Sequence, residues 1–175
     1  MSDPIDLLME DHRTIESVLA AIRIAARKEV PLDFYADVVD FIVNYADGYH
    51  HAREEDRLFP VMERRGIPRE GGPIGVMCAE HVMGREHVAR MREHLEAEDL
   101  AQLRLESRAY AALLEGHIEK EDVVLFPMGR EMLAPEELEQ LSAEFRDLDP
   151  SGAIRARYIA LADSLRERAE TAPEL

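Results

Sequence analysis

Histidine and glutamate recur at one fixed spacing in this chain. His50 precedes Glu54 by four residues, and His117 precedes Glu121 by the same step. Four residues advance an α-helix by about 40° beyond a full turn, so each pair projects to one side of its helix. A buried carboxylate is costly unless a cation accompanies it. Because imidazole and carboxylate without thiolate suit iron, manganese or zinc, the two pairs indicate a metal site.

Two further histidines lie on apolar faces of other segments. His12 falls in a stripe of apolar residues at steps of three and four that begins at Ile5, and His81 falls in another that begins at Ile74. A single histidine on an apolar face is usually a hydrogen-bonded core residue. Four of them, one on each helix, together with two matched His–Glu steps, favour a shared metal site over coincidence.

The elements that would position these residues are all helices. Apolar residues recur with helical periodicity over residues 5–22, 39–61, 74–95 and 110–128, and no segment shows the sustained alternation of a strand. The sequence therefore predicts an all-α, up-down-up-down four-helix bundle over residues 1–133. Residues 134–175 would form an extension of shorter helices, divided near Pro150, that packs on the bundle or mediates a dimer contact.

The second and fourth helices contain a short internal repeat. The segment from His50 to Pro60 aligns without a gap to the segment from His117 to Pro127, and both end in Leu-Phe-Pro. We expect each Leu-Phe-Pro to pack below the site, with its proline bending or ending the helix. Tyr110 lies two turns before His117 on the same stripe. It would either donate a hydrogen bond behind the ligands or fill the core.

Composition narrows the class of protein. The chain has 175 residues, 46% hydrophobic and 33% charged, as in a soluble globular domain. Its net charge of −16 disfavours nucleic acid and anionic membranes as partners. The acidic N-terminus does not resemble a secretory signal, and no apolar run is long enough to span a membrane, so we expect a cytoplasmic protein. The single cysteine, Cys78, excludes a cysteine-based zinc cage within one chain.

With these motifs, the chain resembles the hemerythrin-like, or HHE cation-binding, domain over about residues 5–130. The resemblance rests on His12 in Asp-His-Arg-Thr-Ile-Glu, on His81 in Ala-Glu-His-Val-Met-Gly-Arg and on the two repeats. It implies a four-helix bundle with a non-heme di-iron centre, in which two oxygen- and carboxylate-bridged irons meet O2, NO or peroxide. Carried over by position, the terminal ligands would be His12, His50, His81 and His117, and the bridging carboxylates Glu54 and Glu121.

One position departs from the oxygen-carrying members that the chain resembles. Their third helix supplies two histidines four residues apart, but Arg85 stands four residues after His81 here. His87 is on another face of that helix. In this respect the pattern is more similar to the iron–sulfur-repair di-iron proteins and to the hemerythrin domain of the iron-sensing F-box subunit. Reversible O2 transport is therefore less expected than sensing, NO or peroxide chemistry, or iron handling.

Several residues are candidates for an additional ligand. His51 and Glu55 lie on a polar edge of the second helix. Three roles are open for them: exposed residues, hydrogen-bond partners behind the ligands, or metal ligands. Glu16 follows His12 by four residues and so repeats the His–Glu step. Asp122 competes with Glu121 as the bridge, and the matched step favours Glu121.

We expect a di-iron protein that exists as a monomer or homodimer. The sequence shows no separate acid–base pair or nucleophile, so any enzymatic activity would be oxidoreductase or peroxidase chemistry at the metals, and whether the chain turns over a substrate stays open. An iron-responsive regulatory module and a structural metal-binding bundle without redox activity are the alternatives.

Overall fold

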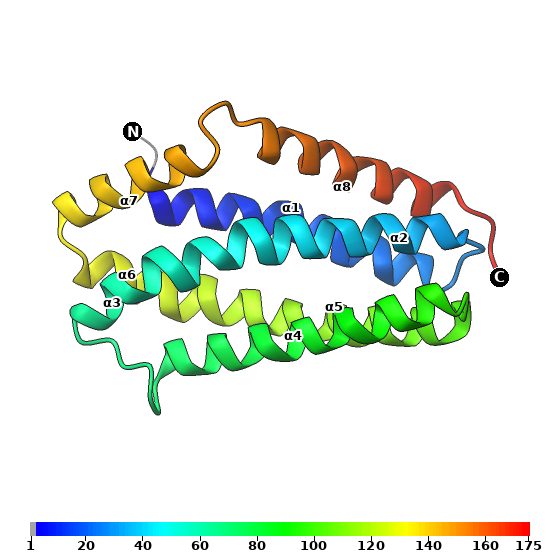
Figure 1. The fold of residues 1–175 in the computed structure, drawn as a ribbon, viewed down its shortest axis with the longest axis horizontal. Coiled ribbons are helices and arrows are strands. Elements are labelled where there is room, and N and C mark those ends of the chain that lie inside the picture. Colours follow the sequence, from blue (N-terminus) through cyan, green and yellow to red (C-terminus); the bar gives the residue numbers. More distant parts are fainter. Residues whose placement is uncertain (1–2) are drawn as a thin grey trace.

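The computed structural model describes residues 3–175, and within them the chain is helical apart from short connections and one isolated bridge between Lys28 and Glu174. This confirms the expectation of an all-α chain. Four long helical stretches lie side by side along the long axis, and two further helices cover one side of them (Figure 1). No helix among the described residues is long and apolar enough to cross a membrane.

The first and third long stretches are regular α-helices. Helix α1 (Pro4–Ala25) begins at Asp3, whose side chain accepts a hydrogen bond from the backbone N–H of Ile5 at 2.8 Å, while Pro4 occupies the first turn. Helix α4 (Pro73–Glu96) also begins at a proline and packs along the fourth stretch. Each buries its apolar stripe and carries one buried histidine within that stripe.

The second and fourth stretches change between α- and π-helical geometry without a break. The second consists of α2 (Leu32–Phe41), η1 (Ile42–His51), η2 (Glu54–Leu58) and α3 (Phe59–Arg64). The fourth consists of α5 (Leu100–Lys120), η3 (Glu121–Leu125) and α6 (Phe126–Met132). Here η denotes a π-helical segment, in which hydrogen bonds reach five residues back.

Each of the two Leu-Phe-Pro sequences begins at the last residue of a π-helical segment. The N–H of Phe59 bonds the carbonyl of Glu54, and the N–H of Phe126 bonds that of Glu121, in each case five residues earlier. A proline ring clashes with the carbonyl four residues before it in a regular α-helix. The wider turn relieves that clash, so the helix continues through both prolines and does not end there.

The core consists of two apolar clusters separated by a polar level. On α1 the first cluster begins at Ile15, whereas Ile5 and Leu8 belong to the second, and His12 lies between them. On α4 the same division falls between Met77 and Val88, on either side of His81. The polar side chains of all four stretches therefore meet at one level of the bundle, which we call the ligand layer.

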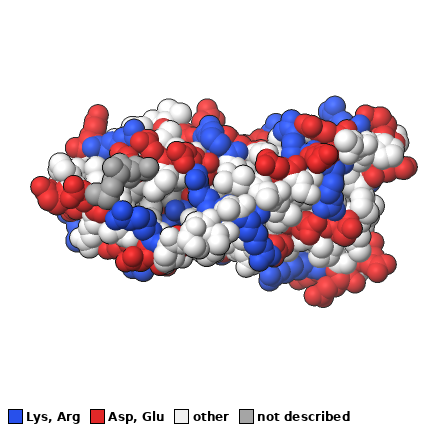
Figure 2. All heavy atoms as spheres, turned by 90° about the horizontal axis from the view of Figure 1, so that it is seen from above, with Lys and Arg blue, Asp and Glu red and all other residues white. Residues whose placement is uncertain are grey.

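The C-terminal helices pack on the outside of this arrangement. Helix α7 (Pro135–Leu148) contacts α1 and η2, and α8 (Ala153–Thr171) runs along α1 and α2. The ring of Tyr158 of α8 meets that of Phe41 edge to face and that of Tyr45 at a tilt, with ring centroids 6.0 and 5.6 Å away. On the face that α7 and α8 cover, Lys and Arg side chains are interspersed among the acidic ones (Figure 2).

Candidate metal centre

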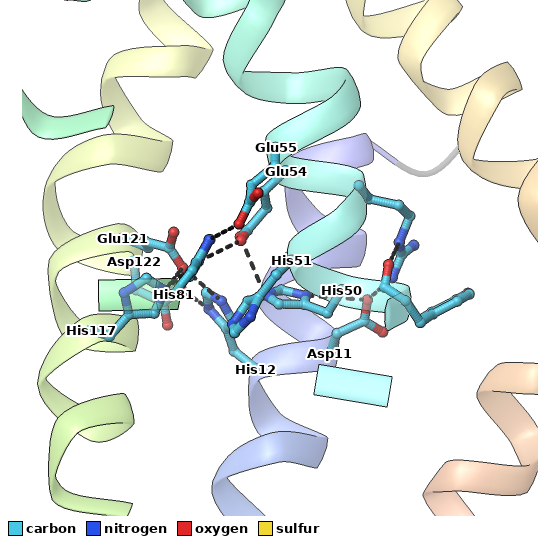
Figure 3. Close-up of polar contacts among 12 residues, drawn as sticks. Asp11, His12, His50, His51, Glu54, Glu55, His81, His117, Glu121 and Asp122 are labelled. Carbon is cyan, nitrogen blue, oxygen red and sulfur yellow. Dashed lines mark hydrogen bonds and ion pairs between the residues drawn. The ribbon is translucent and has the colours of Figure 1, made fainter. Parts of the chain in front are cut away.

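Seven histidine and glutamate side chains converge on the ligand layer (Figure 3). All of them are 4% exposed or less. Helix α1 supplies one, η1 supplies two, and η2, α4, α5 and η3 supply one each; in chain order they are His12, His50, His51, Glu54, His81, His117 and Glu121. The six residues that the repeats and the two apolar stripes singled out therefore lie together, and His51 joins them.

These side chains form two groups of four potential ligands, and within each group the ligand atoms lie within 4.8 Å of one another. One group is His12, His50, Glu54 and Glu121, and the other is His51, Glu54, His81 and His117. Glu54 belongs to both. Its Oε1 lies 3.2 Å from Nε2 of His50, and its Oε2 lies 3.5 Å from Nε2 of His81. The two oxygens of this carboxylate thus face different groups.

Glu121 also lies between the groups. Its Oε2 is 3.2 Å from Nε2 of His12 in one group and 3.3 Å from Nε2 of His117 in the other. Asp122, the competing candidate for a bridge, points to the outer side of the layer and contacts Nδ1 of His12 instead. The geometry places Glu121, not Asp122, where a carboxylate could contact two cations.

Several donor atoms that face the inside of the layer lack hydrogen-bond partners. Both carboxylate oxygens of Glu54 and of Glu121 are buried without one, and so are Nε2 of His12 and Nε2 of His50. Leaving one buried polar group unsatisfied costs about 1–3 kcal/mol, and more for a charged group. Carboxylates and imidazoles that converge in this way fit metal cations, which would satisfy all of these atoms at once.

Each histidine of the layer has a carboxylate facing Nδ1 on its outer side. The distances from Nδ1 to the nearest carboxylate oxygen are 2.6 Å for His12–Asp122, 2.6 Å for His81–Glu55, 3.0 Å for His117–Glu80, 3.4 Å for His51–Asp47 and 3.6 Å for His50–Asp11. An ionised carboxylate can only accept, so in the four closer contacts Nδ1 is the donor, and Nε2 is the ring nitrogen that faces the other ligands. Metal-binding histidines characteristically have such partners.

The outer carboxylates are in turn paired with cationic side chains. Arg85 contacts Asp47 and Glu55, each at 2.8 Å, and thereby joins the partners of His51 and His81. The other outer pairs are Asp122 with Arg13, Glu80 with Lys120, and Asp11 with Arg53 and Arg155. The layer is therefore a charge network in which each carboxylate lies beside positive charge.

This network shifts the pKa values of its members. Burial alone would lower the pKa of His12, but the hydrogen bond to Asp122 and the nearby negative charge of Glu121 outweigh it and raise this pKa to about 9. Burial would also lower the pKa of His117, but the negative charge of Glu121 outweighs it and raises this pKa to about 10. Burial would raise the pKa of Glu121, yet His117 and His12 hold it well below its usual range. Glu121 is thus an anion that requires nearby positive charge.

His51 differs from the other histidines in its surroundings. Burial and the neighbouring His81 lower its pKa well below the usual value, so it is a neutral imidazole, the form that binds metal. Its ring stacks on that of His81 with centroids 3.9 Å apart. His51 and His81 also line a cavity of about 180 Å³, together with Ile42, Arg85 and Tyr110.

The remaining candidates lie outside the two groups. Glu16 is 40% exposed and pairs with Arg13 at 3.2 Å. Glu55 bonds Nδ1 of His81 at 2.6 Å, and the buried Tyr110 lines the cavity. Sequence reasoning missed Asp11 and Glu80, although each directly precedes a layer histidine in the chain. That shared position was a signal that could have found both.

Comparison with known proteins identifies the family. The model of the hemerythrin HHE cation-binding domain matches residues 3–129. Uncharacterized proteins of Mycobacterium bovis and of two strains of Mycobacterium tuberculosis are 24% identical over 172 residues, an alignment that covers 91% of this chain and 66% of each relative. The chain thus spans just under two thirds of their length, and no solved structure matches it. The matched region contains every histidine and glutamate of the ligand layer, and the chain belongs to the hemerythrin HHE cation-binding family.

Proposed function

We propose that this chain is a hemerythrin-like non-heme di-iron protein that binds or reacts with O2, NO or peroxide, and that its four long stretches form an up-down-up-down bundle around the metals. The observation that carries the proposal is the position of Glu54 and Glu121, each between two groups of buried histidines. Carboxylates shared in this way offset the repulsion between two neighbouring cations, which a single metal would not require.

We assign the ligands by group. His12 and His50 would bind one iron, and His51, His81 and His117 would bind the other, with Glu54 and Glu121 shared. His51 would take the role of the second histidine that α4 lacks at Arg85. Bound iron would supply redox and Lewis-acid chemistry toward small diatomic ligands and peroxide.

The protein's own contribution is to orient the ligands and to admit small molecules. Arg85 fixes Asp47 and Glu55, which hold the rings of His51 and His81 from behind. The cavity beside these two rings has apolar walls that include Ile42 and suits a small uncharged molecule. We therefore propose that small ligands approach the three-histidine group through this cavity.

The first test is the amount of iron bound per chain. The protein is loaded with Fe(II) under anaerobic conditions and analysed for iron, and its visible spectrum is recorded before and after exposure to air. We expect two irons per chain and the charge-transfer bands of an oxidised iron pair after exposure. One metal or none would contradict the paired site and leave a mononuclear site or a structural bundle.

A second candidate function is an iron-responsive regulatory module. One observation favours it: Arg155 of α8, outside the region that the family model matches, reaches the carboxylate that faces His50. In such a module, removal of iron by a chelator would change helicity or oligomeric state, measured by circular dichroism and sedimentation. A reactive centre held in a rigid bundle would change neither.

A further inference from the structure

Asp11 is a fully buried carboxylate at the edge of the ligand layer. Its Oδ1 accepts hydrogen bonds from the hydroxyl of Tyr45 at 2.8 Å and from Nε of Arg155 at 3.0 Å, and its Oδ2 is paired with Arg53. The same Oδ2 lies 3.6 Å from Nδ1 of His50 (Figure 3). Three donors therefore compete with His50 for one carboxylate.

The equivalent contact in the other group is closer. Nδ1 of His117 lies 3.0 Å from Glu80, which is paired with Lys120. The separation between His50 and Asp11 is the longest of the five histidine–carboxylate distances in the layer. The long separation coincides with the added donors on Asp11.

Arg155 is held in place by more than Asp11. Its Nη2 contacts Glu10 at 2.8 Å, and its backbone N–H donates to Asp149 at 3.1 Å, at the start of α8. Its side chain is 29% exposed, so the guanidinium spans from the surface to the buried carboxylate. Helix α8 therefore presents this cation to the ligand layer in a defined position.

We propose that Arg155 is a positioning residue that weakens the contact between Asp11 and His50, and so lowers the metal affinity of the group containing His12 and His50. The proposal rests on the proposed metal-binding function. A histidine binds metal more strongly when its other ring nitrogen donates to a carboxylate. Arg155 takes up part of the capacity of Asp11 as an acceptor, and its positive charge also opposes a nearby cation.

The test compares Co(II) affinity between the wild-type chain and Arg155→Met, with a chelator as competitor and the visible Co(II) bands as a second readout. We expect one of the two Co(II) ions to bind about three- to tenfold more tightly in the variant, with changed bands for that ion. Arg155→Lys keeps the charge and should return the affinity toward wild type. The matched control is Arg157→Met on the same helix, where Arg157 is 69% exposed and lies 3.6 Å from Asp40.

The direction of the change separates this role from a purely structural one. A residue that only anchors α8 would lower both stability and Co(II) affinity on removal, and unchanged or weaker affinity in Arg155→Met overturns the proposal. A wild-type chain that binds fewer than two Co(II) ions contradicts the paired site itself and the inference with it. If the wild-type chain binds two Co(II) ions but the variant does not bind either more tightly, the inference about Arg155 is overturned and the paired site stands.

A measurement on the wild-type chain covers the case in which Arg155→Met does not fold. Binding free energies are reciprocal, so if Arg155 opposes metal, metal must loosen the contact of Arg155 with Asp11. Addition of Co(II) should therefore speed amide hydrogen exchange in the first turns of α8, from Ala153 to Tyr158, while exchange around the layer slows. Slower or unchanged exchange in those turns contradicts the proposal.

Discussion

The two groups of the ligand layer are built by the same contacts in two different places. Glu55 and Asp122 each follow a shared glutamate, and each contacts a histidine of another helix. A carboxylate oxygen of Glu55 lies 2.6 Å from Nδ1 of His81, and one of Asp122 lies 2.6 Å from Nδ1 of His12. The residue before each of those histidines faces the histidine of a repeat. Asp11 faces His50 at 3.6 Å, and Glu80 faces His117 at 3.0 Å.

The phenylalanines of the two repeats follow the same rule. Phe126 stacks on His12 with ring centroids 5.3 Å apart, and Phe59 stacks on His81 at 6.2 Å. The layer therefore has an approximate two-fold relation, in which α1 corresponds to α4 and the second long stretch corresponds to the fourth.

Two departures from this relation make the groups unequal. The residue after His50 is His51, whereas the residue after His117 is the buried Ile118, so one group gains a third histidine and an adjoining cavity. The other group is bounded by α8, through Arg155. The comparison teaches that a repeated frame can give two groups of potential ligands different surroundings when single positions differ.

The largest effect is expected from the shared glutamates. Glu54→Gln keeps the shape of the side chain but removes the charge that both groups use, and Glu121→Gln does the same from the other repeat. We expect either variant to lower metal affinity at least about 100-fold and to bind fewer than two ions under conditions that load the wild type. Elemental analysis checks this, with the partly exposed Glu16→Gln as control. Full loading of both variants would contradict the sharing of these carboxylates.

The next effect concerns the histidine that distinguishes the groups. His51→Ile places at this position the residue type that the second repeat has at Ile118. We expect the affinity of one metal to fall about 10- to 100-fold while the other is unchanged, because His51 belongs to one group only. A two-step Co(II) titration measures both affinities. Equal losses at both steps would show that the groups are not separable in this way.

A smaller loss of metal affinity, similar for the two groups, is expected from the carboxylates that contact Nδ1 of the layer histidines. Glu55→Gln and Asp122→Asn each replace a carboxylate 2.6 Å from Nδ1 of a layer histidine. We expect each variant to lower the affinity for one metal ion about tenfold. Glu55→Gln should do so at the three-histidine group, and Asp122→Asn at the other group. The same titration distinguishes them. A loss in the same step for both variants would break the two-fold relation.

The smallest effect is expected from an exposed arginine. Arg13 is 57% exposed and is paired with Asp122. Surface pairs contribute little, so Arg13→Met should change metal affinity by less than about threefold. A tenfold loss in a competition titration would place Arg13 among the residues that determine affinity.

The sequence was enough to predict the helices and most of the layer, because helical periodicity is local. The steps from His50 to Glu54 and from His117 to Glu121 depend only on the rotation of one helix. The role of His51 stayed open because a regular α-helix turns adjacent residues far apart. The π-helical geometry of η1 has less rotation per residue, and both His50 and His51 are buried in the layer.

Contacts between distant segments could not be predicted in the same way. Asp11 directly precedes His12 but faces His50, and Arg155 reaches Asp11 across 144 residues of sequence. Which partner each side chain meets depends on how the helices pack. The carboxylates before His12 and His81 were visible in the sequence, but their partners were not.

The polar level between the two apolar clusters also has a consequence for the order of folding. Its ligands are spread from His12 to Glu121, so the level is complete only when all four long stretches have docked. Each of its charges must lose water at that step, and the loss is compensated only once the opposite charges have arrived. The two apolar clusters can collapse earlier, around a level that still contains water. Closure of this level would then be a late event in folding, and metal released during unfolding would report the separation of the whole bundle.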